Sequence, residues 1–207
     1  AEAEKITPII ALNKSDLAEP FARAWARLAP YRAMGYAVLP LALSPRGEVP
    51  EGDGLPALVD ALRGQHTLVL GPSGSGKSTL INRLVPGAQA ETGEISQALN
   101  SGKHTTTNTR WYWVDALDGP GQRGALIDSP GFQEFGLHHI EPTRLAECMP
   151  DLRQYLGQCK FYNCTHLHEP GCAVLAQVAA EGRGGTISER RHRIYAQLFE
   201  ELGRQRW

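Results

Sequence analysis

Apolar and polar positions alternate along the chain in blocks that predict strands and helices in turn. Apolar runs predict strands at 7–12, 37–43, 67–70, 111–114 and 125–127, and helical spacing covers 17–34, 54–62 and 188–202. Strands that alternate with helices are typical of a mostly parallel sheet between helical layers. We therefore expect a three-layer α/β domain over residues 1–136 and a small, mostly helical domain over 137–207.

Composition narrows the classes of protein that remain. The formal net charge of the 207 residues is −1 at pH 7, so any contact with RNA must come from a local patch. No run approaches the roughly 20 apolar residues that span a bilayer, and the first thirty residues lack the features of an export signal. We expect a cytoplasmic protein without membrane contact, and the polar stretch 86–108 is predicted to be a mobile loop.

A phosphate-binding loop follows the strand predicted at 67–70. The pattern G-x-x-x-x-G-K-S comprises Gly71, Pro72, Ser73, Gly74, Ser75, Gly76, Lys77 and Ser78, and Thr79 continues into the next helix. In such a loop backbone N–H groups and the helix N-terminus face the phosphates, Lys77 reaches the β and γ phosphates, and Ser78 ligates Mg²⁺. A glycine-rich turn that merely caps a helix is the alternative, and the loop does not by itself identify the base.

The base is indicated by a second motif, N-K-x-D, after the first predicted strand. It consists of Asn13, Lys14, Ser15 and Asp16, and it distinguishes guanine-binding G domains. The Asp16 carboxylate offers two acceptors that match the N1–H and N2–H₂ donors of guanine. Asn13 is expected to brace the loop, and the stem of Lys14 to lie along the base. Backbone contacts to the guanine oxygen are assigned to 40–44, and a polar turn is the alternative for the tetrapeptide.

Two further segments match the switches of a G domain. Thr106, in the run 105–107, is predicted to bind Mg²⁺ and sense the γ-phosphate, although a solvated Ser/Thr linker would look similar. Asp128 and Gly131 belong to D-x-P-G, where Asp128 contacts Mg²⁺ through water and Gly131 donates to the γ-phosphate; an ordinary turn is the alternative.

A catalytic glutamine is absent from the position after this motif. Phe132 stands there and cannot orient water, so His104 is the candidate catalytic group, or else a solvent-exposed switch residue.

Three cysteines and a histidine form a metal-ligand pattern in the second domain. Cys159, Cys164, His166 and Cys172 have the spacing C-x4-C-x-H-x5-C, which supplies the four ligands of a structural zinc site. Buried free cysteines or a disulfide are the alternatives, and His168 is a possible substitute ligand.

The order of the motifs is rotated. N-K-x-D precedes the phosphate loop and D-x-P-G, whereas an ordinary G domain begins with the phosphate loop. With the run Lys103-His104-Thr105-Thr106-Thr107 and the Cys/His pattern, the chain resembles the bacterial ribosome small-subunit-dependent GTPases over nearly its whole length. That resemblance implies a circularly permuted G domain, a zinc domain and late maturation of the small ribosomal subunit. It also implies an N-terminal OB-fold, which has no counterpart here.

These observations predict a Mg²⁺-dependent, ribosome-stimulated GTPase with GTP or GDP, Mg²⁺ and one structural Zn²⁺ as ligands. The small ribosomal subunit and its rRNA are the expected partners, and a monomer is expected. The alternatives are a zinc-dependent RNA-binding module in which GTP is only a conformational ligand, and a P-loop nucleotide kinase. Contact with rRNA is assigned to a basic C-terminal segment that contains Arg183, Arg190, Arg191, His192, Arg193, Arg204 and Arg206, unless this is a solvated helix face.

Overall fold

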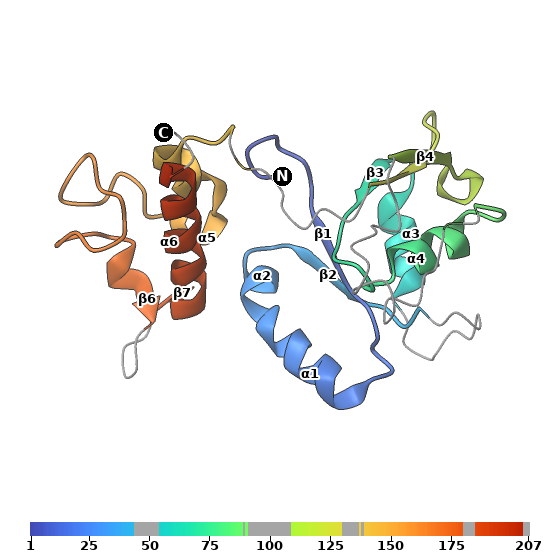
Figure 1. Ribbon diagram of the computed structural model, residues 1–207, viewed down its shortest axis with the longest axis horizontal. Helices are drawn as coiled ribbons and strands as arrows, with labels where there is room; N and C mark the ends of the chain where they lie inside the picture. The colour runs from blue at the N-terminus through green and yellow to red at the C-terminus, as the bar shows by residue number, and fades with distance from the viewer. Residues whose placement is uncertain are drawn as a thin grey trace. The chain divides into compact units, whose positions relative to one another are not determined.

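The computed structural model describes residues 1–43, 54–88, 90, 109–129, 137, 139–179 and 185–204. Contacts divide the chain into two compact units, each with its own core (Figure 1). One unit consists of residues 9–29 and 37–135, and the other of residues 1–8, 30–36 and 136–207. Two short N-terminal segments therefore group with the cysteine-rich half of the chain.

The first unit, residues 9–29 and 37–135, contains the phosphate loop and five strands. β1 (Ile9–Leu12) and β2 (Ala37–Pro40) form a parallel pair. β3 (His66–Val69) pairs in parallel with β5 (Ala125–Asp128), and β4 (Arg110–Trp113) pairs with β5 in the antiparallel sense. The described strands thus form a parallel sheet in the order β1-β2 and a mixed sheet in the order β3-β5-β4.

The long helix predicted over 17–34 is interrupted. α1 (Ala18–Arg27) ends where Leu28 donates its N–H to Trp25, and α2 (Ala29–Ala33) follows. Pro30 explains the break, because proline is accepted in the first turn of a helix but not in its interior. The proline was the visible sequence signal for two helices.

Two helices cover the sheets of this unit on their apolar sides. α3 (Leu55–Leu62) follows β2, and α4 (Lys77–Leu84) follows the phosphate loop. A short 3-10 helix, η2 (Asp115–Leu117), connects β4 to β5. The core they enclose contains Leu41, Leu58, Leu62, Leu80, Leu84, Val114, Leu117 and Leu126. This packing fixes α4 behind the phosphate loop.

The second unit is built around α6 (Glu189–Arg204) and an irregular, cysteine-rich segment. Its other elements are η3 (Pro142–Cys148), α5 (Pro150–Arg153), η4 (Leu175–Gln177) and a parallel pair of two-residue strands, β6 (Val178–Ala179) and β7 (Ile187–Ser188). Tyr195 and Leu202 of α6 are buried against Leu145, Ala146 and Leu152. Regular structure is sparse in this unit, so we expect the cysteine cluster to contribute to its stability.

Within the described part of the chain, no helix is long and apolar enough to cross a membrane.

Candidate functional site

The phosphate loop lies between β3 and α4, as its motif predicts. Gly74 and Gly76 have positive φ angles of 75° and 105°, which glycine adopts without steric cost. At Gly76 a Cβ would also collide with the side chain of Asn13. The loop therefore curls tightly into α4, whose first turn contains Lys77, Ser78 and Thr79. Free N–H groups at this helix start suit an anion.

Lys77 folds back over the loop. Its Nζ donates to the carbonyl of Gly71 at 2.6 Å and of Pro72 at 3.0 Å. Burial lowers the pKa of Lys77, an effect that attraction to Asp128 partly offsets. Burial likewise raises the pKa of Asp128, which is 4% exposed at the end of β5, and Lys77 and Arg110 partly offset the rise. A cation and a carboxylate are thus held in a low-dielectric region beside the loop.

The base-recognition loop is hydrogen-bonded directly to the phosphate loop. Asn13 follows β1, and its Nδ2 donates to the carbonyl of Ser75 at 3.1 Å, while its Oδ1 accepts the N–H of Leu43 at 2.9 Å. Lys14 adopts a positive φ of 69°, and the N–H of Ser15 donates to Leu41 at 2.9 Å. Asn13 therefore braces the loop, and Asp16, two residues before α1, is exposed.

The structure restricts which backbone N–H groups of residues 40–44 could donate to the guanine oxygen. Pro40 has no N–H, and the N–H of Leu41 donates to Leu12 at 2.8 Å. The N–H of Leu43 is used by Asn13. These three positions therefore offer no free backbone donor to a base.

Several predicted residues lie outside the described ranges. They are His104, the threonines 105–107 with Thr106, Gly131 and Phe132. The structure places Asp128 of D-x-P-G, and Ser129 next to it is 3% exposed with its hydroxyl donating to the carbonyl of Val69 at 3.5 Å. The end of β5 is thus joined to the end of β3, which leads into the phosphate loop.

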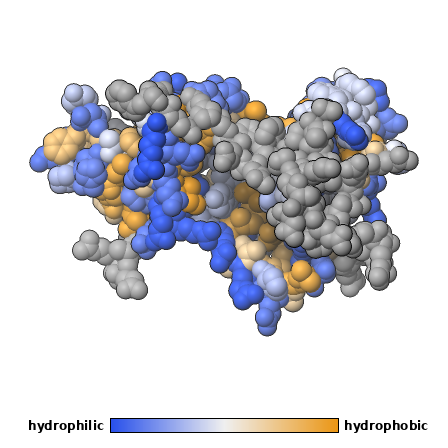
Figure 2. All heavy atoms as spheres, in the orientation of Figure 1, coloured by the Kyte–Doolittle hydropathy of each residue, from blue (hydrophilic) through white to orange (hydrophobic). Residues whose placement is uncertain are grey.

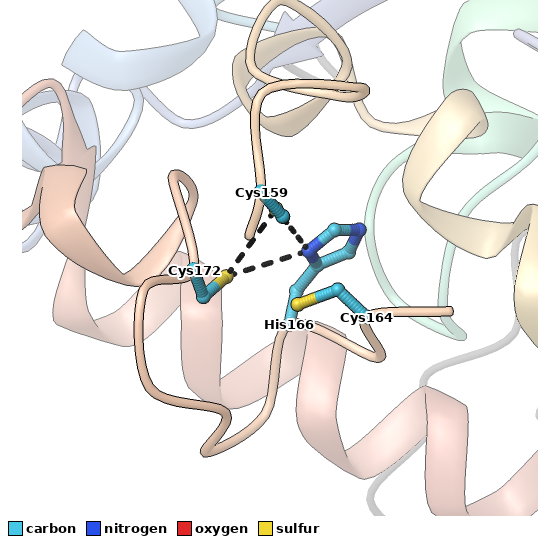
Figure 3. Close-up of side chains that lie close together, drawn as sticks. All are labelled: Cys159, Cys164, His166 and Cys172. Carbon is cyan, nitrogen blue, oxygen red and sulfur yellow. Dashed lines mark hydrogen bonds between the residues drawn. The ribbon is translucent and has the colours of Figure 1, made fainter. Parts of the chain in front are cut away.

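The four predicted zinc ligands lie together in the second unit (Figure 3). Their ligand atoms all lie within 4.8 Å of one another. Nδ1 of His166 is 3.5 Å from Sγ of Cys159 and 3.4 Å from Sγ of Cys172, and the two sulfur atoms are 3.9 Å apart. Zinc bonds of about 2.3 Å to sulfur and about 2.0 Å to nitrogen in a tetrahedron imply separations of about 3.8 Å and 3.5 Å. The donor set therefore fits zinc.

Groups around this cluster hold its loops in place. The N–H groups of Ala173 and Leu175 donate to the sulfur atoms of Cys159 and Cys172, both at 3.4 Å. Burial lowers the pKa of His166, which favours the neutral imidazole that a metal requires. His168, the possible substitute ligand, is exposed and lies outside the cluster.

The same loop is braced by contacts that no local sequence pattern revealed. The Glu169 carboxylate accepts N–H donors from Thr165, Leu167 and His168. Burial opposes ionisation of Glu169, but the Thr165 hydroxyl and the backbone N–H groups of Thr165, Glu169 and His168 hold its pKa far below its usual range. From α6, the Tyr195 hydroxyl donates to the carbonyl of Thr165 at 2.7 Å. Of these groups, Tyr195 is the one that the tertiary fold brings to the metal-ligand loop.

The basic C-terminal segment is divided by the structure. Arg191 is largely buried and makes a bidentate ion pair with the buried Asp151, with both N–O distances 2.9 Å. Arg193 and Arg204 pair with Glu189 and Glu200 one helical turn away. Arg183 and Arg206 lie outside the described residues. Arg191 therefore pairs within the fold, whereas Arg193 and Arg204 are exposed and pair along the helix.

This strand, glycine-rich loop and helix, braced by the asparagine of an N-K-x-D loop, define a P-loop nucleotide-binding protein of the G-domain type with rotated motif order. A model of the family described as RsgA GTPase matches residues 1–138, and the chain belongs to this family.

Relatives and solved structures agree with this assignment. The chain is 64% identical over 207 residues to the "Small ribosomal subunit biogenesis GTPase RsgA" of Variovorax paradoxus, with 100% of the chain and 63% of the relative covered. It is 52% identical over 202 residues to the protein of the same name from Paraburkholderia xenovorans, with 97% and 61% covered. The chain thus spans less than two thirds of the length of these relatives.

Two crystal structures resemble the whole chain. YjeQ from Thermotoga maritima is matched with a TM-score of 0.72 and 28% identity, over 98% of this chain and 62% of that one. YloQ, described as a circularly permuted GTPase, is matched with a TM-score of 0.69 and 27% identity, over 100% and 60%. The permuted α/β fold predicted from motif order is confirmed.

Proposed function

We propose that this chain binds guanine nucleotide, hydrolyses GTP to GDP and phosphate, and acts in late maturation of the small ribosomal subunit in the cytoplasm. The hydrogen bond from Asn13 to the carbonyl of Ser75 carries the proposal, because it joins the base-recognition loop to the phosphate loop. Relatives that are named small ribosomal subunit biogenesis GTPases support the ribosomal role.

The residues divide the work as follows. Asp16 selects guanine, and the loop amides from Gly71 to Gly76 with Lys77 hold the phosphates. Lys77 exchanges its loop carbonyl partners for phosphate oxygens, whose negative charge favours the ammonium form and opposes the effect of burial on the pKa of Lys77. Mg²⁺, held by Ser78 and Thr106 and through water by Asp128, would neutralise charge on the β and γ phosphates.

Hydrolysis is an in-line displacement at the γ-phosphorus. The oxygen of water bonds to phosphorus as the bond to the β–γ bridging oxygen breaks, the water loses a proton to solvent, and GDP and phosphate leave. Gly131 is assigned to donate to the γ-phosphate and His104 to orient the water, since Phe132 cannot. We assign zinc to Cys159, Cys164, His166 and Cys172, where it closes a loop-rich module. We keep the domain boundary near residue 136 and the monomeric state as predictions.

Turnover measurements test this proposal. We expect slow multiple-turnover hydrolysis of GTP by the chain alone and faster hydrolysis when small ribosomal subunits are added. ATP should not be hydrolysed, which separates a GTPase from a nucleotide kinase. Absence of GTP turnover under both conditions would refute the enzymatic part and favour a module that uses GTP as a conformational ligand.

Base selection is tested by Asp16→Asn. The carboxamide replaces an acceptor with a donor, so it opposes guanine and suits the oxygen at position 2 of xanthine. We expect GTP affinity to fall and the affinity for xanthosine triphosphate to rise, each measured by competition against a fluorescent nucleotide. Unchanged preference for GTP would contradict the role of Asp16.

A further inference from the structure

The tip of the cysteine-rich loop presents two aromatic rings to solvent. Between Cys159 and Cys164 lie Lys160, Phe161, Tyr162 and Asn163, and all four are exposed. Phe161 is 42% exposed and Tyr162 is fully exposed, whereas Tyr195 of the same unit is 1% exposed. Figure 2 shows hydrophobic and hydrophilic residues together at the surface of this part of the molecule, at the left of the view. The two rings contribute little to the core, so they are available to a partner.

The loop that carries these rings is held in a defined shape. Its end residues, Cys159 and Cys164, belong to the metal-ligand cluster, and the N–H of Lys160 donates to the carbonyl of Gly171 at 3.0 Å. Gly171 has a φ of 75°, and a Cβ there would lie 3.0 Å from Cβ of Lys160. The stem of Lys160 therefore lies against Gly171. Because the loop is already ordered, it loses little conformational entropy when a partner binds, and this favours affinity.

Electrostatics favour an anionic partner at this tip. Nζ of Lys160 lies 5.6 Å from the centroid of the Phe161 ring. The four residues include no carboxylate, and the neighbouring carboxylate of Glu169 is occupied by backbone N–H donors. Aromatic faces stack on unpaired bases, an ammonium neutralises phosphate, and an exposed amide such as that of Asn163 can pair with base edges.

We propose that Lys160, Phe161, Tyr162 and Asn163 form a site that stacks unpaired bases of single-stranded RNA, with Tyr162 as the principal stacking residue. This inference rests on the proposed ribosomal role for the source of the RNA, and it replaces the basic α6 segment as the main RNA contact. An apolar protein surface would be matched by aliphatic side chains, and the four tip residues include none.

Binding of a fluorescein-labelled single-stranded RNA of about ten nucleotides to the zinc-loaded full chain tests the site. We expect Tyr162→Ala to weaken binding by about tenfold to a hundredfold, since it removes one base–aromatic stack. Tyr162→Trp should keep the affinity, and Tyr162→Leu should lose it as alanine does. Lys160→Gln should lower the salt dependence by about one ion, whereas the tyrosine variants should not.

Controls separate this site from other effects. Trp111→Ala, which removes a 48% exposed ring from β4 in the other unit, should leave RNA affinity unchanged. Zinc content and GDP affinity should match wild type in every variant. Wild-type affinity in Tyr162→Ala, or an equal loss in Trp111→Ala, would overturn the proposal. So would a leucine variant that binds RNA or small subunits as wild type does, because the contact would then be apolar. RNA binding is measured without GTP, so its failure is distinct from failure of the GTPase proposal.

Discussion

At the scale of single residues, Asn13 shows how a short motif acquires a structural meaning. Both polar atoms of its side-chain amide form hydrogen bonds with the backbone, one with Ser75 in the phosphate loop and one with Leu43 after β2. Gly76 must be glycine partly because Asn13 occupies the space of a Cβ. Base recognition and phosphate recognition are therefore geometrically dependent on each other.

Changing Asn13 should weaken nucleotide binding through this brace. Asn13→Asp keeps an acceptor for the N–H of Leu43 but replaces the donor to Ser75 with an acceptor. We expect this change to lower the affinity for GDP by about fivefold to tenfold, the effect of about one hydrogen bond. Asn13→Ala should lower the affinity for GDP by at least as much. Titration with a fluorescent GDP analogue measures this. Equal affinity in wild type and both variants would mean that the brace does not support the site.

Tyr36 should make stability depend on alkaline pH. Its hydroxyl donates to Glu2 at 2.7 Å. Burial, this hydrogen bond and the charge of Glu2 together raise its pKa from 10.0 to about 12, against the opposing effect of Arg191 and Arg153. A raised pKa favours the neutral phenol in the folded state, so its contribution is complete below the unfolded value and is lost as pH rises through the folded one.

We therefore expect wild type to be more stable than Tyr36→Phe at neutral pH. The difference should shrink between about pH 10 and pH 12. Urea unfolding of both proteins at several pH values measures it, and other titrating groups cancel in the comparison. A difference that stayed constant over this range would argue against the interaction with Glu2.

At the scale of elements, α6 joins distant segments of its unit. Arg191 in its first turn pairs with Asp151 of α5, and its guanidinium lies 5.2 Å from the centroid of the Tyr31 ring. Four residues later, Tyr195 holds the carbonyl of Thr165 in the cysteine-rich loop. One face of the helix therefore connects α2, α5 and the metal-ligand loop.

Removing one partner of the buried ion pair should be costly. The side chains of Arg191 and Asp151 are 12% and 8% exposed, so Arg191→Ala leaves a carboxylate buried without its cation. We expect a loss of about 3–5 kcal/mol in the free energy of unfolding, measured by urea titration. The matched control is Arg193→Ala, whose pair with Glu189 is exposed and should contribute no more than about 0.5 kcal/mol. Similar losses in both variants would show that burial of the pair does not matter.

At the scale of the whole molecule, two units with separate cores should respond differently to loss of zinc. The cysteine-rich unit has a core of its own, but it contains little regular structure. A metal that joined Cys159, Cys164, His166 and Cys172 would add cross-links to a unit with little regular structure. The unit that contains the phosphate loop has strands and helices around an independent apolar core.

Chelation of zinc should therefore unfold one unit and leave the other intact. In hydrogen exchange we expect protection to be lost in α6 while the amides of β5 remain protected. Cys172→Ser should have the same effect without chelator, and Cys148→Ser, outside the cluster, should not. Loss of protection in β5 as well as in α6 would contradict independent units.

Several structural features of this protein could be predicted from strong local patterns in its sequence. The strand, loop and helix around Lys77, the N-K-x-D loop and the spacing of the four metal ligands depend on neighbours in the chain, so local spacing reveals them, and the order of the motifs reveals the permuted fold. Pro30, by contrast, was an available signal for a helix break that the helical spacing obscured.

Only the tertiary structure decided which polar groups are used and which remain free. The N–H groups of Leu41 and Leu43 donate hydrogen bonds to acceptors about 30 residues away in the sequence. Arg191 pairs with the carboxylate of Asp151, which lies 40 residues away. A basic residue in a charged helix and a donor in a turn look alike in sequence whether or not such partners exist. The physical reason is that burial and pairing are properties of segments brought together by folding, whereas turns and ligand spacing are properties of the local chain.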